Sequence, residues 1–249
     1  MLGAGQLMIL QACAQAVIVI TLAPDPSQAF DRWLDAVIGA GLALVMATVA
    51  PSAPVRRPRV LAAQVLCDMA ATLEAAAQAL RAGDQAAADA VLEQARRGAA
   101  GLRRFSDAAE EGLAVVRLSP FRRHQLPGVM AYAELYEPLD HASRNLRVLA
   151  RRCAVALWRG EAVPGVYLVL MERLAVVIRF MAGELHARRM PTAARQQLIR
   201  IGEESSHLKL VDSISAVVIL AQLRSMTSDL LELTGIDYAE ARELIPEMD

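Results

Sequence analysis

Hydrophobic and polar residues are distributed unevenly along this chain, with a break near residue 55. Residues 1–24 contain no charged side chain, and after a short acidic stretch a second uncharged run extends over residues 36–55. Beyond this point arginine and glutamate recur throughout. Two adjacent apolar segments of this kind predict a transmembrane hairpin in residues 1–55, followed by a polar domain in residues 56–249.

The lengths of the two apolar segments are compatible with a bilayer. A helix rises about 1.5 Å per residue and the hydrocarbon core is about 30 Å thick, so spanning it takes about 20 residues, or about 17 at the short end. Helices over residues 7–23 and 33–50 satisfy this requirement without excess. The alternative is that both are buried helices of a large soluble core. A secretory signal peptide is disfavoured, because no basic residue precedes Arg32.

The charges beside the second helix predict its orientation. The loop before this helix is net acidic, whereas the helix exits into Arg56, Arg57 and Arg59. Because basic residues concentrate on the cytoplasmic side of membrane helices, these three arginines are expected at the cytosolic rim. The predicted localisation is therefore the inner (plasma) membrane, as a multi-pass protein with its C-terminal domain in the cytoplasm.

Two glutamines are the main polar side chains of the first apolar segment. Gln11 and Gln15 lie one turn apart on the same helical face. A primary amide facing lipid is costly, so this pair is expected to face another helix or a water-filled path. An interhelical hydrogen bond and a pathway-facing role both remain open.

The composition after the hairpin favours helix over sheet. Hydrophobic residues make up 55% of the chain but aromatic residues only 4%, and much of the apolar content is alanine and leucine, which are strong helix formers. The net charge of −1 provides no basic excess for nucleic acid. The predicted fold is therefore all-α, with a two-helix transmembrane hairpin followed by a cytosolic antiparallel helical bundle.

Glycine, proline and apolar periodicity predict where the helices of the bundle begin and end. Pro58 is expected in the first turn of a helix that stops at Gly83, and Asp84 is expected to cap the next helix. This second helix is expected to be interrupted near Gly98 and Gly101. Further helices are expected over residues 129–158, with Pro138 kinking this helix or displacing its start, and over residues 163–189 and 210–233, the last two central in the bundle. A short acidic helix is expected over residues 236–249.

The sequence contains no recognisable catalytic motif. Its four histidines, at positions 124, 141, 186 and 207, fall at no spacing typical of a zinc or iron site, and no cysteine lies near enough in sequence to complete one. No glycine-rich phosphate loop and no serine elbow occurs. The sequence therefore predicts no catalytic residue, no cofactor, no metal ligand and no enzymatic activity.

Three stretches of the cytosolic region carry a family resemblance. They are EEGL through RLSPFRRH in residues 110–124, LDHASRNLRVLARR in residues 139–152 and AQLRSMTSDLLELTG in residues 221–235. All three resemble segments of fusaric acid resistance proteins, also called the aromatic acid exporter family. The first is similar to the segment that closes the first cytosolic helical pair, and the third is similar to the C-terminal end of actinobacterial members.

This resemblance implies a membrane-transport function. It implies an integral inner-membrane protein that exports aromatic carboxylic acids or related small organic compounds. Family members carry more membrane helices than the two expected here, so the chain looks like the last membrane hairpin plus the cytosolic domain, from either a truncated reading frame or a shortened relative. Transport would then require a homo-oligomer or a subunit that supplies further membrane helices. The alternative is a membrane-anchored helical interaction or regulatory module without transport activity.

Overall fold

The structure is a computed structural model that describes residues 13, 33–35, 37–42, 53–118 and 120–248. The chain divides into two compact units, Met1–Pro51 and Ser52–Asp249. Within the expected second membrane helix, residues 33–35 and 37–42 are helical. Gln11, Gln15 and most of the expected hairpin lie outside the described residues, so the hairpin stays a prediction.

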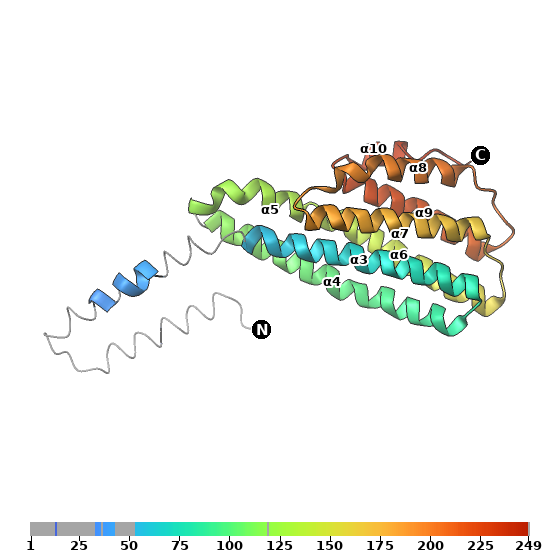
Figure 1. Cartoon of the computed structure of the whole chain (residues 1–249), viewed down its shortest axis with the longest axis horizontal. Helices are drawn as coiled ribbons and strands as arrows, with labels where there is room; N and C mark the ends of the chain where they lie inside the picture. The colour runs from blue at the N-terminus through green and yellow to red at the C-terminus, as the bar shows by residue number, and fades with distance from the viewer. Residues whose placement is uncertain (1–12, 14–32, 36, 43–52, 119, 249) are drawn as a thin grey trace. The chain divides into compact units, whose positions relative to one another are not determined.

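The second unit consists of helices joined by short connections (Figure 1). Helix accounts for 85% of the structure, and the described residues include no strand, which confirms the all-α fold class. The elements are α3 (Ala53–Ala82), α4 (Gln85–Leu118), η1 (Pro120–Gln125), α5 (Leu126–Ala133), α6 (Tyr136–Arg159), α7 (Gly165–His186), η2 (Pro191–Ala194), α8 (Arg195–Ser206), α9 (Ile214–Glu232) and α10 (Tyr238–Glu243).

Local sequence signals set several helix ends. α3 stops at Gly83, which has a φ of +66°, a conformation that glycine adopts without steric cost. The Asp84 carboxylate then accepts a hydrogen bond from the Ala87 N–H at 3.0 Å and caps α4. The predicted stop and cap are therefore confirmed. In the same way, the Ser213 hydroxyl accepts a hydrogen bond from the Ala216 N–H and caps α9.

Two expectations about helix boundaries are wrong, and a third is right only in part. α3 begins at Ala53, so Pro58 lies inside the helix, where its missing N–H removes one helical hydrogen bond. α4 continues through Gly98 and Gly101, because packing along α3 outweighs the modest helix cost of glycine. The helix expected over residues 129–158 is two helices, with a break at residues 134–135, and Pro138 lies in the first turn of α6, which agrees with the expectation that it displaces the start.

The core lies where α3 packs against α4 and α7 and where α6 packs against α4 and α9. It is built mostly from buried leucine, alanine and methionine, with Tyr167 and Phe105 as its largest members. α7 and α9, which were expected to be central, each bury one face in this core. Two helices of this unit, α3 over Pro54–Ala82 and α9, are long and apolar enough to cross a membrane, and 56% and 61% of their most apolar windows are buried inside the bundle.

Candidate functional site

A pocket of about 930 Å³ lies between α6, α9 and the α10 region. This volume is within the range of about 300–1,000 Å³ that is typical of small-ligand sites. The pocket lining is mostly polar and charged. Its members are His141, Arg144 and Asn145 from α6, Arg224, Ser225, Ser228 and Asp229 from α9, and Tyr238, Ala239, Arg242, Glu243, Ile245, Pro246 and Glu247 from the C-terminal segment.

Helical periodicity places the polar residues of α6 and α9 along facing stripes. His141 and Asn145 are four residues apart and lie on one face of α6. On α9, Ser228 and Glu232 are also four residues apart, with Asp229 beside them. Because α6 and α9 pack along each other, the two polar stripes meet inside the bundle.

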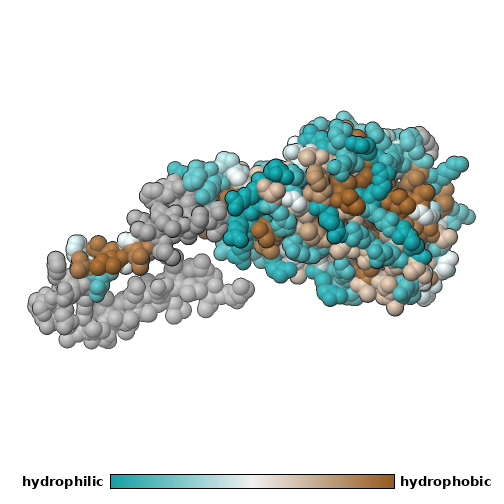
Figure 2. Space-filling model, viewed as in Figure 1, coloured by the Kyte–Doolittle hydropathy of each residue, from teal (hydrophilic) through white to brown (hydrophobic). Residues whose placement is uncertain are grey.

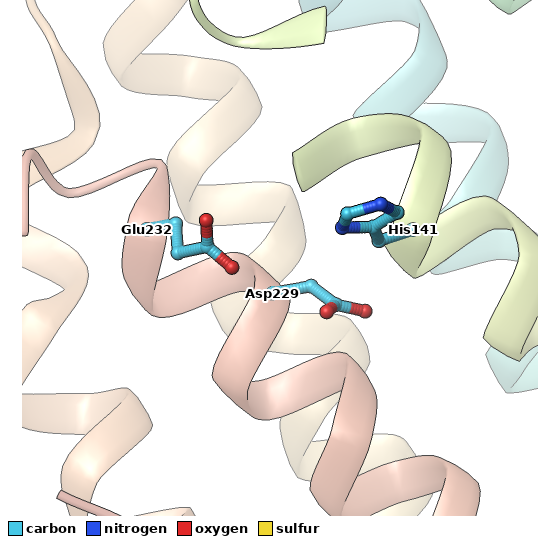
Figure 3. Close-up of side chains that lie close together, drawn as sticks. All are labelled: His141, Asp229 and Glu232. Atoms are coloured by element: carbon cyan, nitrogen blue, oxygen red, sulfur yellow. The ribbon is translucent and has the colours of Figure 1, made fainter. Parts of the chain in front are cut away.

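The closest group in this region consists of His141, Asp229 and Glu232. Figure 3 shows the His141 ring extending from α6 toward the Asp229 carboxylate on α9, with Glu232 one turn further along α9. One potential ligand atom from each residue lies within 4.8 Å of those of the other two. Asp229 is only 6% exposed, and its Oδ2 accepts a hydrogen bond from Asn145 Nδ2 at 2.7 Å. Three ionisable side chains from two helices therefore converge here.

Burial dominates the electrostatics of the two carboxyl groups. It raises the pKa of Asp229 to about 6, against the opposing effects of the Asn145 hydrogen bond and the charge of His141. Burial also raises the pKa of Glu232, again opposed by His141. Within the described part of the chain, neither carboxylate forms an ion pair with arginine or lysine. Buried carboxylates without a cationic partner are uncommon and costly.

Two polar atoms, one beside the group and one in it, have no hydrogen-bond partner among the described residues. Ser228 is 9% exposed and lines the pocket, and its hydroxyl makes no hydrogen bond to any described residue. The Oε1 atom of Glu232 is likewise buried without a hydrogen-bond partner among those residues. Because buried polar atoms are normally satisfied, these two atoms are available as hydrogen-bonding groups for a ligand that reaches them.

The basic residues of the pocket are Arg144, Arg224 and Arg242. Arg144 pairs with an aspartate one turn earlier on α6, and Arg224 donates to the Ser205 hydroxyl at 2.6 Å. Arg242 instead lies over the ring of Tyr238, with its guanidinium carbon 5.5 Å from the ring centroid. Tyr238 is 54% exposed, so this stacked pair is accessible from solvent.

The structure separates the three arginines that were expected at the cytosolic rim. Arg56 is exposed, and Arg57 pairs with Glu111 at 2.6 Å while remaining exposed. Arg59 is only 7% exposed, and its guanidinium donates to the carbonyls of the last two residues of α7, at 2.9 Å each. Arg59 is thus a structural donor inside the bundle, and Arg56 and Arg57 are the members with exposed side chains.

Sequence reasoning did not identify the group around Asp229. Asn145 and Asp229 are 84 positions apart, and spacing rules compare only near neighbours. One signal was present, because Asp229 and Glu232 are the two carboxylates of α9 and lie near its end.

Comparison with known proteins gives one relative. No family model matches the chain, and no solved structure matches it. An uncharacterised protein of Corynebacterium glutamicum is 30% identical over 239 residues. The match covers 93% of this chain and 61% of the relative, so the chain spans about three fifths of the length of the curated relative that it matches.

Proposed function

We propose that this chain is a component of an inner-membrane export system for aromatic carboxylic acids or related small organic acids. In this proposal, the helical unit is cytoplasmic and binds the acid in the pocket between α6, α9 and α10. The observation that carries it is the stacked pair of Arg242 and Tyr238 at a pocket of ligand size. A guanidinium binds a carboxylate through two parallel hydrogen bonds, and a tyrosine ring offers an apolar face to an aromatic ring.

The remaining parts have assigned roles in this proposal. Residues 1–55 form the membrane hairpin, with Gln11 and Gln15 facing a polar pathway and Arg56 and Arg57 at the cytosolic rim. Two helices enclose no continuous path by themselves. A homo-oligomer, or a subunit with further membrane helices, therefore completes the transporter in the lipid bilayer.

Benzoate binding and efflux test the proposal. In the full chain purified in detergent, Arg242→Met is expected to weaken benzoate binding about tenfold, because it removes a charge-assisted hydrogen-bonding group. In cells without another copy, the same variant is expected to retain more radiolabelled benzoate than the wild type. Arg151→Met is the matched control, since Arg151 is exposed on α6 and does not line the pocket.

Each arm of this experiment has an outcome that contradicts the proposal. Equal benzoate binding by wild type and Arg242→Met would contradict binding of the acid in this pocket. Unchanged efflux after deletion of the whole chain would remove the transport function. For the membrane part, Gln11→Leu combined with Gln15→Leu should lower efflux at normal protein level and oligomeric state, and unchanged efflux would contradict a pathway role.

One observation favours the second candidate, an interaction module without transport activity. The solvent face of α7 carries Val166, Val169, Val176 and Phe180, which are 39–62% exposed, with Arg173 between them. The spacing alternates between three and four residues, as in the seam of a coiled coil. Hydrophobic patches are visible on the face of the bundle shown in Figure 2. In this candidate, the α7 face pairs with the same face of a second copy of the chain.

Self-association tests this second candidate directly. Val169→Asp with Val176→Asp should convert a dimer to a monomer in sedimentation equilibrium, because two charges would be buried in the seam. Val148→Asp is the control, since Val148 on α6 is similarly exposed but lies outside the α7 face. A monomeric wild type, or a dimer that survives both aspartates, would rule out the α7 face as the contact.

A further inference from the structure

The group formed by His141, Asp229 and Glu232 provides three potential metal ligands, and no arginine or lysine of the described residues pairs with its carboxylates. Its potential ligand atoms lie within 4.8 Å of one another. We infer that these three residues bind a divalent transition-metal ion, such as Zn²⁺ or Mn²⁺, between α6 and α9. This role goes beyond the proposed binding of an organic acid and does not depend on it.

The geometry requires only small side-chain movements. Zinc lies about 2.0–2.2 Å from nitrogen and oxygen ligands, so neighbouring ligand atoms around it are about 3–3.5 Å apart. Atoms that are now within 4.8 Å of one another therefore close on the ion by rotation of side chains. α6 and α9 already pack against each other, so the ion would link two helices that are in contact without it.

Asn145 fixes the carboxylate at the centre of the site. Its Nδ2 donates to Asp229 Oδ2 at 2.7 Å, which leaves the other carboxylate oxygen for the metal. A hydrogen bond of this kind orients a metal ligand and tunes the affinity of the site. Asn145 is thus a positioning residue for the proposed ion.

The pocket side of the site retains an open position. Three protein ligands leave one coordination position of a tetrahedral ion for water or another ligand. The Ser228 hydroxyl, which is nine-tenths buried, lacks a partner among the described residues and lines the same pocket. It is suited to hydrogen-bond a water molecule on the ion. This unpartnered hydroxyl supports the inference independently of the three ligands.

The donor set selects the class of ion. One imidazole with two carboxylates suits Zn²⁺, Mn²⁺ or Fe²⁺, whereas Mg²⁺ and Ca²⁺ prefer oxygen ligands alone. We therefore expect Zn²⁺ and Mn²⁺ to bind more tightly than Mg²⁺.

Calorimetric titration of the full chain in detergent, after treatment with EDTA and its removal, tests the inference. The wild type should bind one Zn²⁺ ion per chain, and MgCl₂ should not compete at equal concentration. His141→Ala and Glu232→Gln should each weaken Zn²⁺ binding about 100-fold or more, since changes to residues that only orient ligands already cost about 10- to 100-fold. Asn145→Ala should weaken binding about tenfold, as a positioning residue would.

Two controls match these variants in chemistry. His124→Ala removes an exposed histidine outside the site, and Glu247→Gln removes a pocket carboxylate outside the group. Both should bind Zn²⁺ like the wild type. The visible absorption of Co²⁺ in the same site should lose its imidazole contribution in His141→Ala but not in His124→Ala.

The inference is overturned if the wild type binds neither Zn²⁺ nor Mn²⁺, or if binding survives both His141→Ala and Glu232→Gln. The wild-type titration decides the first case even if a variant fails to fold. Asp229→Asn, which conserves side-chain shape, provides a further ligand variant. Because metal binding is measured without benzoate, and benzoate binding can be measured without metal, failure of either proposal is distinguishable from failure of the other.

Discussion

At the start of α3, the buried guanidinium of Arg59 donates hydrogen bonds to both carbonyls that end α7. Between α6 and α9, by contrast, the Asp229 carboxylate has one side-chain donor, and the Ser228 hydroxyl has no partner among the described residues. The two regions also differ in space. A Cβ atom added to Gly112 would lie 2.6 Å from the Pro54 carbonyl oxygen, whereas a pocket of about 930 Å³ lies beside Asp229. Filled space with satisfied polar groups indicates stability, and open space with unsatisfied polar groups indicates binding.

This difference predicts opposite signs for mutations in the two regions. Substitutions at the start of α3 should destabilise the protein, because they break contacts that are already satisfied. Removal of charge between α6 and α9 should stabilise the metal-free protein, because functional sites often retain costly groups.

The largest effect is expected for Arg59→Met. The variant keeps the apolar stem but removes one donor from each of the two α7 carbonyls, so that the Leu185 carbonyl keeps its backbone donor, the Arg188 N–H at 3.1 Å, and the part-buried His186 carbonyl loses its donor. Urea unfolding followed by circular dichroism should show a loss of about 2–4 kcal/mol in unfolding free energy. Arg57→Met is the control, because its ion pair with Glu111 is exposed and should contribute about 0–1 kcal/mol. Equal losses in the two variants would contradict the role of Arg59.

The next largest change in unfolding free energy is expected at one of two glycines of α4, and the other glycine serves for comparison. Gly112→Ala should lower the unfolding free energy by about 2 kcal/mol, because the new Cβ clashes with the backbone of α3 and outweighs the gain in helix propensity. Gly98→Ala should instead raise it by up to about 1 kcal/mol, since a Cβ at Gly98 meets no atom within 4 Å among the described residues. Stabilisation by both alanines in the same unfolding assay would mean that α3 and α4 approach less closely than the structure shows.

The ends and the interruptions of helices show how much of the fold could be predicted from the sequence. The stop at Gly83 and the cap at Asp84 depend on neighbouring residues and were predicted correctly. The expected break near Gly98 and Gly101 was wrong, because the propensity of single glycines is weak compared with packing along a whole helix. Local signals therefore located helices better than they located interruptions within them.

Contacts between residues that are far apart in the chain could not be predicted from the sequence. Arg59 belongs to a run of three arginines, and nothing in that run indicates that the third donates to α7, 126 positions away. The group around Asp229 forms only when α6 and α9 pack together, so spacing rules missed it. The hairpin expected in residues 1–55 and the pathway role of Gln11 and Gln15 remain predictions, because those glutamines lie outside the described residues.

A smaller effect than those of Arg59→Met and Gly112→Ala, and of opposite sign to both, is expected for Asp229→Asn. The folded protein raises the pKa of Asp229 from 3.8 to about 6, so the folded state binds a proton more tightly than the unfolded state between these pH values. The group therefore costs no stability below pH 3.8, costs more as pH rises, and exerts its full cost above about pH 6. This pKa difference corresponds to about 3 kcal/mol.

In the presence of EDTA at pH 8, Asp229→Asn should raise the unfolding free energy by about 1–2 kcal/mol, which is less than the full ionisation cost because the amide replaces the carboxylate imperfectly. The gain should disappear near pH 4, whereas Asp107→Asn, at an exposed position on α4, should show no such pH-dependent gain. Saturating Zn²⁺ should reverse the order, because binding stabilises only the chain that retains the ligand. Destabilisation of Asp229→Asn at pH 8 without metal would place Asp229 with Arg59 among the structural groups, and the contrast between the two regions would be lost.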